Sequence, residues 1–261
     1  MPAAVREIDP YKIVHAPVMS DSEFGTRAEC PMKTIGIVGG MSWESSAEYY
    51  RQLNEGIKLR LGPTHSAELV MYSMDFHRAA QLEREERWLE LASLLISAIS
   101  RLEKAGADFV MLASNTAHKV AETIQESIQV PLLHIADVAA EAVGREAIST
   151  VGLLGTRFVM EQEFYRQSFC ARGIEVVIPD RSAREYVHNV IFNELCVGQL
   201  IPKSKEALKE IILALQQAGA NAVVLACTEL PLLIQVEDTP VRLFDTLAIH
   251  VNKAVVMALE T

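Results

Sequence analysis

Short apolar runs that end in glycine or small polar residues alternate along this chain with longer stretches of helical periodicity. The run at residues 34–40 (TIGIVGG) has the same pattern as the run at residues 150–156 (TVGLLGT). Continuous apolar runs of this length are typical of buried strands in parallel sheets. We therefore predict a strand in each run, and a further strand at Leu69–Met74.

A second pair of runs matches over eleven positions. Residues 106–116 (GADFVMLASNT) correspond one by one to residues 219–229 (GANAVVLACTE). Each run follows a stretch with leucine or isoleucine at helical spacing, Leu89–Lys104 in one case and Ser204–Gln217 in the other. The glycine that opens each run suits a left-handed helix cap. The chain is thus predicted to contain the same strand and helix unit twice.

This repeat predicts an α/β fold made of two pseudo-symmetric α/β subdomains with parallel sheets, and an active site in the cleft between them. We expect residues 33–137 and 244–261 in the first subdomain and residues 138–243 in the second, with Ala248–Leu259 packed back on the first half. Residues 1–31 are interpreted as an N-terminal extension with no assigned chemistry. They contain no apolar core of a secretory signal.

Composition narrows the possible partners. The 261 residues carry a formal net charge of −10, which argues against nucleic acid, and no run approaches the length of a membrane helix. The four cysteines show neither CxxC nor Cys/His ligand spacing, so we expect free thiols, no metal site and a cytoplasmic location. The glycine turn at residues 36–40 lacks the spacing of a dinucleotide fingerprint.

Ser114 and Cys227 occupy equivalent places in the second pair of runs. Ligands bind beyond the carboxyl ends of parallel strands, so the two side chains are predicted to face one cleft from opposite sides. A helix start after each strand would offer N–H groups to a carboxylate and would lower the pKa of Cys227. For His118, a solvated helix position and a partnership with a site group both stay open.

Several motifs resemble those of the aspartate/glutamate racemase family. They span residues 32–258 and comprise GGMSWES at residues 39–45, SNTAHK at 114–119, LGTR at 154–157, FNELCVG at 192–198 and CTE at 227–229. The chain is most similar to the bacterial L-aspartate/glutamate-specific branch, whose first motif lacks cysteine.

The resemblance implies a cofactor-independent, metal-free isomerase that acts on aspartate/glutamate-type amino acids and commonly forms homodimers. Family members use one cysteine on each face of the substrate Cα. In this chain Ser114 stands in the place of the first cysteine, so Cys227 is expected to be the base toward L-substrates, with Ser114 on the opposite face.

The resemblance also implies substrate-binding residues. These are Met41, Ser42, Asn115, Thr116, Thr228 and Glu229, together with Glu83 or Gln81 after the second strand and Gln199. Near Gln199 some family members carry a basic residue that contacts the side-chain carboxylate of the substrate. Glu83 instead brings a negative charge.

Two other functions fit the same residues. A decarboxylase of the same superfamily works with a single cysteine, and a catalytically weak amino-acid-binding protein needs none. Solvent deuterium incorporation at Cα of an amino acid distinguishes an enzyme from a binding protein, and release of carbon dioxide from a malonate would identify the decarboxylase.

Overall fold

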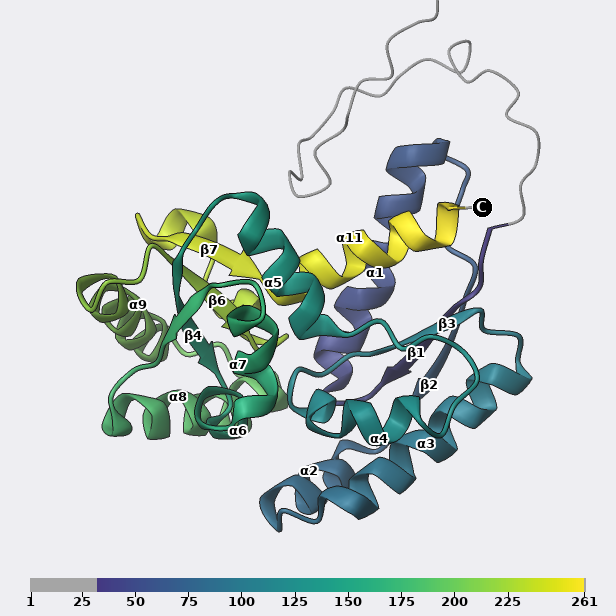
Figure 1. Ribbon diagram of the computed structural model, residues 1–261, viewed down its shortest axis with the longest axis horizontal. Helices are drawn as coiled ribbons and strands as arrows, with labels where there is room; N and C mark the ends of the chain where they lie inside the picture. Colours follow the sequence, from purple (N-terminus) through teal and green to yellow (C-terminus); the bar gives the residue numbers. More distant parts are fainter. Residues whose placement is uncertain (1–31, 261) are drawn as a thin grey trace, which may run out of the picture.

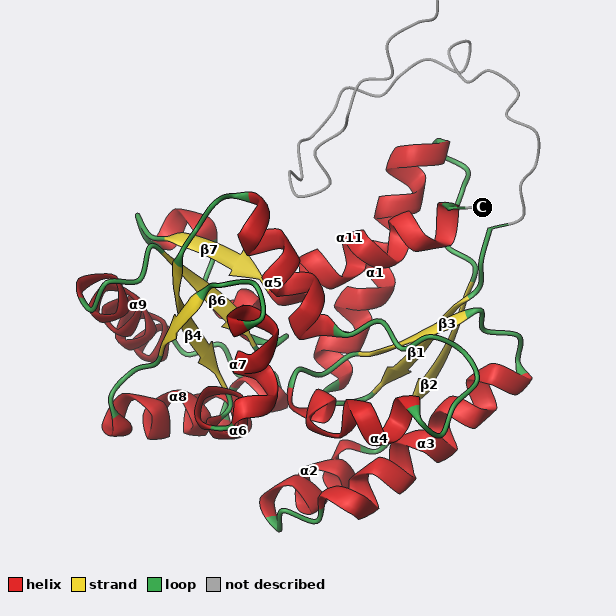
Figure 2. Cartoon of the chain, viewed as in Figure 1, coloured by secondary structure: helices red, strands yellow, loops and turns green. Residues whose placement is uncertain are grey.

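The computed structural model describes residues 32–260, in which strands and helices alternate along the chain (Figures 1 and 2). The predicted N-terminal extension, residues 1–31, lies outside the described residues. None of the helices between residues 32 and 260 combines the length and the apolar character needed to cross a membrane.

The first sheet contains three parallel strands, β1 (Ile35–Gly39), β2 (Leu69–Ser73) and β3 (Phe109–Leu112), in the order β2-β1-β3. An isolated parallel bridge between Val110 and Leu132 continues this sheet beyond β3. The three strands coincide with the apolar runs of the first half, which confirms their prediction.

The second sheet contains four parallel strands, β4 (Thr150–Gly155), β5 (Glu175–Val177), β6 (Ala222–Ala226) and β7 (Arg242–Asp245), in the order β5-β4-β6-β7. The strands of the first pair of runs, β1 and β4, each have a neighbour on both sides. The strands of the second pair of runs, β3 and β6, lie directly beside them. The predicted α/β fold with two parallel sheets is therefore confirmed.

Helices connect the strands. In chain order they are α1 (Trp43–Leu61), α2 (Phe76–Arg84), α3 (Trp88–Lys104), α4 (Ala121–Gln125), α5 (Ile135–Arg145), α6 (Arg157–Glu161), α7 (Glu163–Cys170), α8 (Arg181–Asn193), α9 (Pro202–Gln217), α10 (Leu230–Leu233) and α11 (Thr246–Leu259). Residues 32–260 also contain the short 3₁₀ helices η2 (Thr116–Val120), η3 (Leu195–Val197) and η4 (Val236–Asp238).

The two long helices of the repeat are confirmed as α3 and α9. The second begins two residues earlier than predicted, at Pro202, where the fixed φ of proline suits the first helical turn. Gly106 and Gly219 follow these helices with φ of +91° and +104°, the left-handed conformation that the sequence predicts at both caps.

The hydrophobic core has three parts. The outer face of the first sheet packs on α3, and the outer face of the second sheet packs on α8 and α9. A third cluster joins the inner faces of both sheets through α1, α5 and α11, which lie between them in Figure 1. Because these helices bury apolar side chains against both halves, the relative position of the sheets is fixed by the core.

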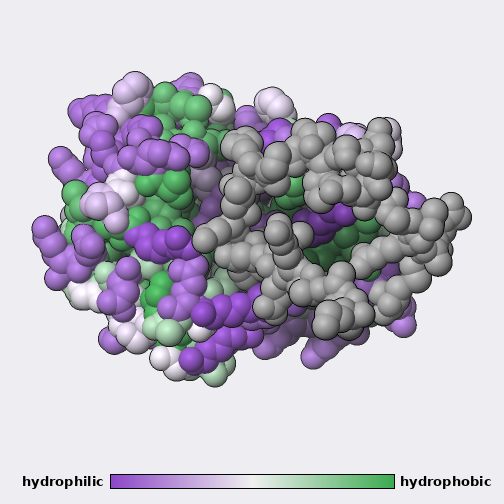
Figure 3. Space-filling model, turned by 90° about the horizontal axis from the view of Figure 1, so that it is seen from above, coloured by the Kyte–Doolittle hydropathy of each residue, from purple (hydrophilic) through white to green (hydrophobic). Residues whose placement is uncertain are grey.

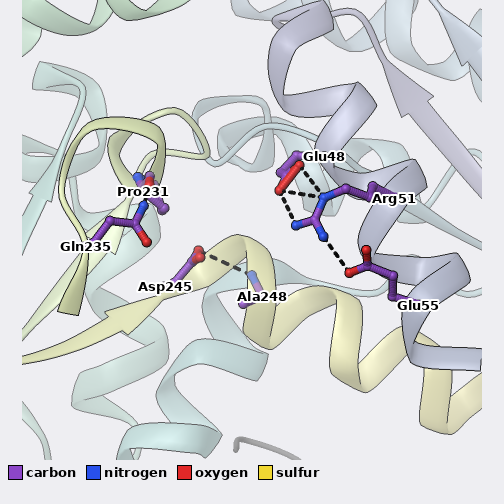
Figure 4. A network of polar contacts seen from close by, with 7 residues as sticks. All are labelled: Glu48, Arg51, Glu55, Pro231, Gln235, Asp245 and Ala248. Carbon is purple, nitrogen blue, oxygen red and sulfur yellow. Dashed lines mark hydrogen bonds and ion pairs between the residues drawn. The ribbon is translucent and has the colours of Figure 1, made fainter. Parts of the chain in front are cut away.

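The C-terminal helix α11 packs against α1 and α5, and Lys33 N–H donates a hydrogen bond to the carbonyl of Ala258. Asp245 starts this helix by accepting hydrogen bonds from the N–H groups of Leu247 and Ala248, the second of which is drawn in Figure 4. The expected subdomain boundaries fall inside α5 and β7.

Polar side chains cover much of the exterior. Figure 3 shows hydrophilic residues surrounding smaller hydrophobic areas over the half that carries the second sheet. Beyond α10, the side chain of Gln235 donates a hydrogen bond to the carbonyl of Pro231 (Figure 4). On α1, Arg51 forms ion pairs with Glu48 and Glu55, both at 2.5 Å. Exposed pairs of this kind contribute little to stability, so the fold rests on its apolar clusters.

Candidate active site

A small, partly enclosed cavity lies where the carboxyl ends of strands from both sheets meet. Its lining comprises Met41, Phe76, Glu83, Ser114, Asn115, Thr116, Thr156, Ile191, Phe192, Cys196, Ala226, Cys227, Thr228 and Glu229. Ligand sites of parallel α/β folds occupy this position. The cavity therefore holds Ser114 and Cys227 in one space, from equivalent points of the two halves.

Ser114 lies just beyond β3 and is 7% exposed. Its hydroxyl oxygen accepts a hydrogen bond from the Ala117 N–H at 3.3 Å. Its backbone carbonyl accepts one from Nδ1 of His118 at 2.7 Å. Both contacts fix the orientation of Ser114 at the cavity wall.

His118 is buried behind Ser114, so the sequence alternative of a solvated helix position is excluded. Its Nε2 accepts a hydrogen bond from the Ile135 N–H at 3.2 Å, which leaves the proton on Nδ1. Burial lowers the pKa of His118 well below its ordinary value, and the neighbouring His134 and His250 add to this. His118 is thus a neutral donor that positions Ser114.

Cys227 lies just beyond β6, and its thiol donates a hydrogen bond to Oε2 of Glu229 at 3.1 Å. The sequence predicts a lowered thiol pKa at a helix start, and this is wrong. Burial raises the pKa of Cys227 well above its ordinary value, and the Glu229 carboxylate raises it further. The backbone N–H groups of Glu229 and Leu230 act in the opposite direction, but the helix that follows has only four residues.

Glu229 is buried yet well supplied with donors. Oε1 accepts hydrogen bonds from the Ser42 N–H and hydroxyl and from the Ser45 hydroxyl, at 3.1, 2.8 and 2.5 Å. Oε2 accepts from the Cys227 thiol and, at 2.9 Å, from the Thr228 hydroxyl. A buried carboxylate is stable when hydrogen bonds replace its hydration in this way.

Two further contacts join the halves at the cavity. Asn115 accepts a hydrogen bond from the Tyr165 hydroxyl at 2.7 Å and donates one to the Thr246 hydroxyl at 3.1 Å. The hydroxyls of Thr116 and Thr156 are 2.9 Å apart. In such a pair one hydroxyl donates to the other, so one hydrogen stays available to a ligand.

Glu83 enters the cavity from α2 and is 3% exposed. Burial, and next the charge of Glu229, raises the pKa of its carboxyl group to about 8. Cys196, which lines the same cavity, has a raised thiol pKa for the same two reasons, burial first.

Most residues named from the sequence line this cavity, and three lie elsewhere. Gln81, the alternative to Glu83, is exposed on α2 and donates a hydrogen bond to Glu85. Ser42 is buried behind the wall, where it donates to Glu229. Gln199 is exposed on the turn after η3 and is not part of the lining. The sequence reasoning missed Thr156 and the lining from α2 and α8, Phe76, Ile191 and Phe192. Thr156 could have been found, since it ends the run of residues 150–156.

Within residues 32–260, no three His, Cys, Asp or Glu side chains are grouped so that they could hold a metal ion. The cysteines at 170, 196 and 227 are all free thiols. The chemistry that this arrangement offers is proton transfer by a thiol, a hydroxyl and carboxyl groups.

Comparison with known proteins identifies relatives over nearly the whole described chain. A family model described as Asp/Glu/Hydantoin racemase matches residues 38–254. The broad specificity amino-acid racemase RacX of Bacillus subtilis is 24% identical over 227 residues, which cover 82% of this chain and 93% of RacX.

Two solved structures are also similar. A Yersinia pestis protein provisionally named an Asp/Glu racemase shares 43% identity and a TM-score of 0.80, over 88% of this chain and all of that one. An aspartate racemase homologue from Pyrococcus horikoshii shares 36% identity and a TM-score of 0.76, with the same two coverages.

Proposed function

Since this chain belongs to the Asp/Glu/hydantoin racemase family, a family of isomerases, we propose that it racemises amino acids by moving the Cα proton between Cys227 and Ser114. One observation carries the proposal. Ser114 and Cys227 line a single cavity from equivalent strand ends of the two halves, β3 and β6. A substrate Cα between them would present one face to each side chain.

The first step makes Cys227 a base. Its thiol already donates to Glu229, so the proton passes along this hydrogen bond to the carboxylate and leaves a thiolate. The thiolate then takes the Cα proton of an L-amino acid, and the electron pair of the C–H bond moves into the substrate carboxylate as an enediolate. A positioned base of this kind contributes about 10²–10⁴-fold to a rate.

The second step returns a proton to the opposite face. The Ser114 hydroxyl gives its proton to Cα, and the Ala117 N–H that contacts Oγ stabilises the charge left on the oxygen. Water then protonates the Ser114 oxygen, and the hydroxide so formed takes back the proton that Glu229 had accepted, which restores the hydroxyl and the carboxylate. A serine hydroxyl is a poor base near neutral pH, so abstraction from D-amino acids is the slower direction.

The enediolate needs donors in a space closed to water. We assign this role to the Thr116–Thr156 hydroxyl pair, which has one hydrogen free. Aspartate and glutamate are the substrates that the resemblance predicts, so both belong in any assay.

The direct test incubates the enzyme with L-amino acids in D₂O. We expect loss of the Cα–H signal in proton NMR, with slower appearance of the D-isomer by chiral chromatography. Binding without exchange would instead support an amino-acid-binding protein. Carbon dioxide release from a substituted malonate, without exchange of amino acids, would support the decarboxylase.

A further inference from the structure

The carboxyl group of Glu83 is buried in the cavity without a partner. It is 3% exposed, it lines the cavity, and none of the hydrogen bonds and ion pairs among the described residues involves its carboxyl oxygens. The neighbouring Arg84 is exposed on the outside of α2 and lowers the pKa of Glu83 only as the smallest of its three influences. A buried carboxyl group with free oxygens is expected to meet a donor that the protein itself does not supply.

The rest of the cavity is also acidic. Its lining contains two carboxyl groups, Glu83 and Glu229, and no lysine, arginine or histidine. The oxygens of Glu229 are occupied by five donors, so Glu83 is the carboxyl group with free capacity. Glu44 contributes further negative charge to this region, since it helps to raise the thiol pKa of Cys196.

An acidic side chain fits this charge distribution poorly. A zwitterionic amino acid brings one cation and one anion, and a second carboxylate would add an anion where no basic residue lines the wall. Opposite charges in a desolvated cavity attract strongly and like charges repel equally. The electrostatics thus favour a substrate whose side chain carries positive charge.

The shape of the lining agrees with such a side chain. The reacting Cα must lie by Ser114 and Cys227, at the strand ends, while α2 and α8 supply Phe76, Ile191 and Phe192. The rings of Phe76 and Phe192 stack with centroids 6.3 Å apart. An apolar surface of this kind suits the methylene stem of a substrate side chain. Glu83 lies on the same helix as Phe76 and could bind a cation at the end of that stem.

From these contacts we propose that the enzyme acts on amino acids with a cationic side chain, such as lysine, ornithine and arginine, and that Glu83 is the residue that selects them. This inference rests on the proposed racemase function. It differs from the aspartate/glutamate class that the resemblance predicts.

One rival role for Glu83 must be separated from this. Because burial raises the pKa of Glu83 to about 8, a protonated Glu83 could donate a hydrogen bond to the side-chain carboxylate of glutamate. Glutamine in place of Glu83 would preserve that donor and abolish a negative charge. Glu83→Gln should therefore lower the activity if Glu83 binds a cation, and keep it if Glu83 donates a hydrogen bond to glutamate.

The experiment measures kcat/KM for Cα–H exchange in D₂O with L-lysine, L-norleucine and L-glutamate. Norleucine keeps an unbranched aliphatic stem and lacks the terminal cation. We expect the wild-type enzyme to prefer lysine to both others by at least about 10-fold. Glu83→Gln should lower the lysine value by about 10–100-fold and leave norleucine within about 3-fold, whereas the control Glu85→Gln, on the exposed end of the same helix, should change neither.

Three results would overturn the inference. The first is a wild-type preference for glutamate, a comparison that needs no variant and so does not depend on Glu83→Gln folding. The second is retention of lysine exchange in a folded Glu83→Gln enzyme. The third is an equal loss with lysine and norleucine, which would place Glu83 at the α-ammonium. Absence of exchange with all three substrates would contradict the racemase function itself. This outcome differs from the three results above, which contradict only the inference about Glu83.

Discussion

The Cys227 thiol and the Glu229 carboxylate are joined by a hydrogen bond of 3.1 Å, two residues apart in the chain and both buried. This contact keeps the thiol protonated, because burial and the adjacent negative charge both raise the pKa of Cys227. The same contact provides the route by which the proton can leave. Cys227 and Glu229 should therefore react as one unit.

Glu229→Gln tests this coupling. Removal of the negative charge should lower the pKa of the Cys227 thiol, since the Glu229 charge is one of the causes that raise it. Alkylation of Cys227 by iodoacetamide, followed by peptide mass spectrometry across a pH series, should show its midpoint moving to lower pH. Cα–H exchange should nevertheless fall by about 10²–10⁴-fold, because the proton acceptor is lost.

The exposed thiol of Cys170 serves as the internal control in the same samples. Its alkylation profile should be identical in wild type and variant. A Cys227 midpoint that stays in place, or an exchange rate that is unaffected, would show that Glu229 has only a structural role.

Ser114→Cys should add a second base to the site. A thiol ionises far more readily than a hydroxyl, and the Ala117 N–H that contacts Oγ would also support a thiolate. We expect exchange of D-amino acids to rise by about 10²-fold or more, with a smaller change for L-amino acids. Chiral chromatography in both directions measures this, and an unchanged D/L ratio would argue that Ser114 does not face the Cα of the substrate.

Glu83→Gln should stabilise the folded protein in a pH-dependent way. The pKa of Glu83 is raised to about 8, so between pH 4.5 and 8 the folded chain keeps a proton that the unfolded chain releases. The wild type then loses stability as pH rises through this window, by up to about 1.4 kcal/mol per pH unit. In urea unfolding, the free energy of unfolding of the variant should equal that of the wild type at pH 4. It should exceed the wild-type value by a constant amount above pH 8.

If that advantage were independent of pH, Glu83 would have to be ionised or solvated in the folded state. Such a result would also weaken the case that its carboxyl group awaits a cationic ligand.

His250→Gln should show the opposite pH dependence. His250 accepts a hydrogen bond from the Tyr49 hydroxyl and donates one to the Leu133 carbonyl, and burial lowers its pKa to about 3. Below pH 6.5 this histidine binds a proton in the unfolded chain but stays neutral in the folded chain. The stability that His250 contributes is therefore lost as pH falls toward 3. In urea unfolding, the substitution should lower the free energy of unfolding most above pH 6.5 and less below it. A constant cost would show that folding leaves the pKa of His250 unchanged.

The repeat makes the fold and the proposed reacting pair readable from the sequence. Two runs that match over eleven positions place Ser114 and Cys227 at equivalent strand ends, because strands end where small polar residues follow apolar ones. The glycines at 106 and 219 mark the two helix ends for the same local reason, a left-handed conformation that other residues avoid.

Properties that depend on distant contacts were not readable. The thiol pKa of Cys227 was predicted in the wrong direction, because local sequence indicates a helix start but not burial or the position of the Glu229 carboxylate. Phe76 and Phe192 lie more than a hundred positions apart, and only the fold stacks them at the cavity. Gln199 was named from the resemblance alone, and the exposed turn that holds it lies outside the cavity.

The central claim is that one thiol, Cys227, removes the Cα proton. The most direct measurement is Cα–H exchange of L-lysine and L-glutamate in D₂O by Cys227→Ala, beside wild type and Cys170→Ala. The account predicts that exchange disappears in Cys227→Ala and is unchanged in Cys170→Ala, whose thiol is exposed and remote from the cavity lining. Exchange that persists in a folded Cys227→Ala enzyme would contradict it.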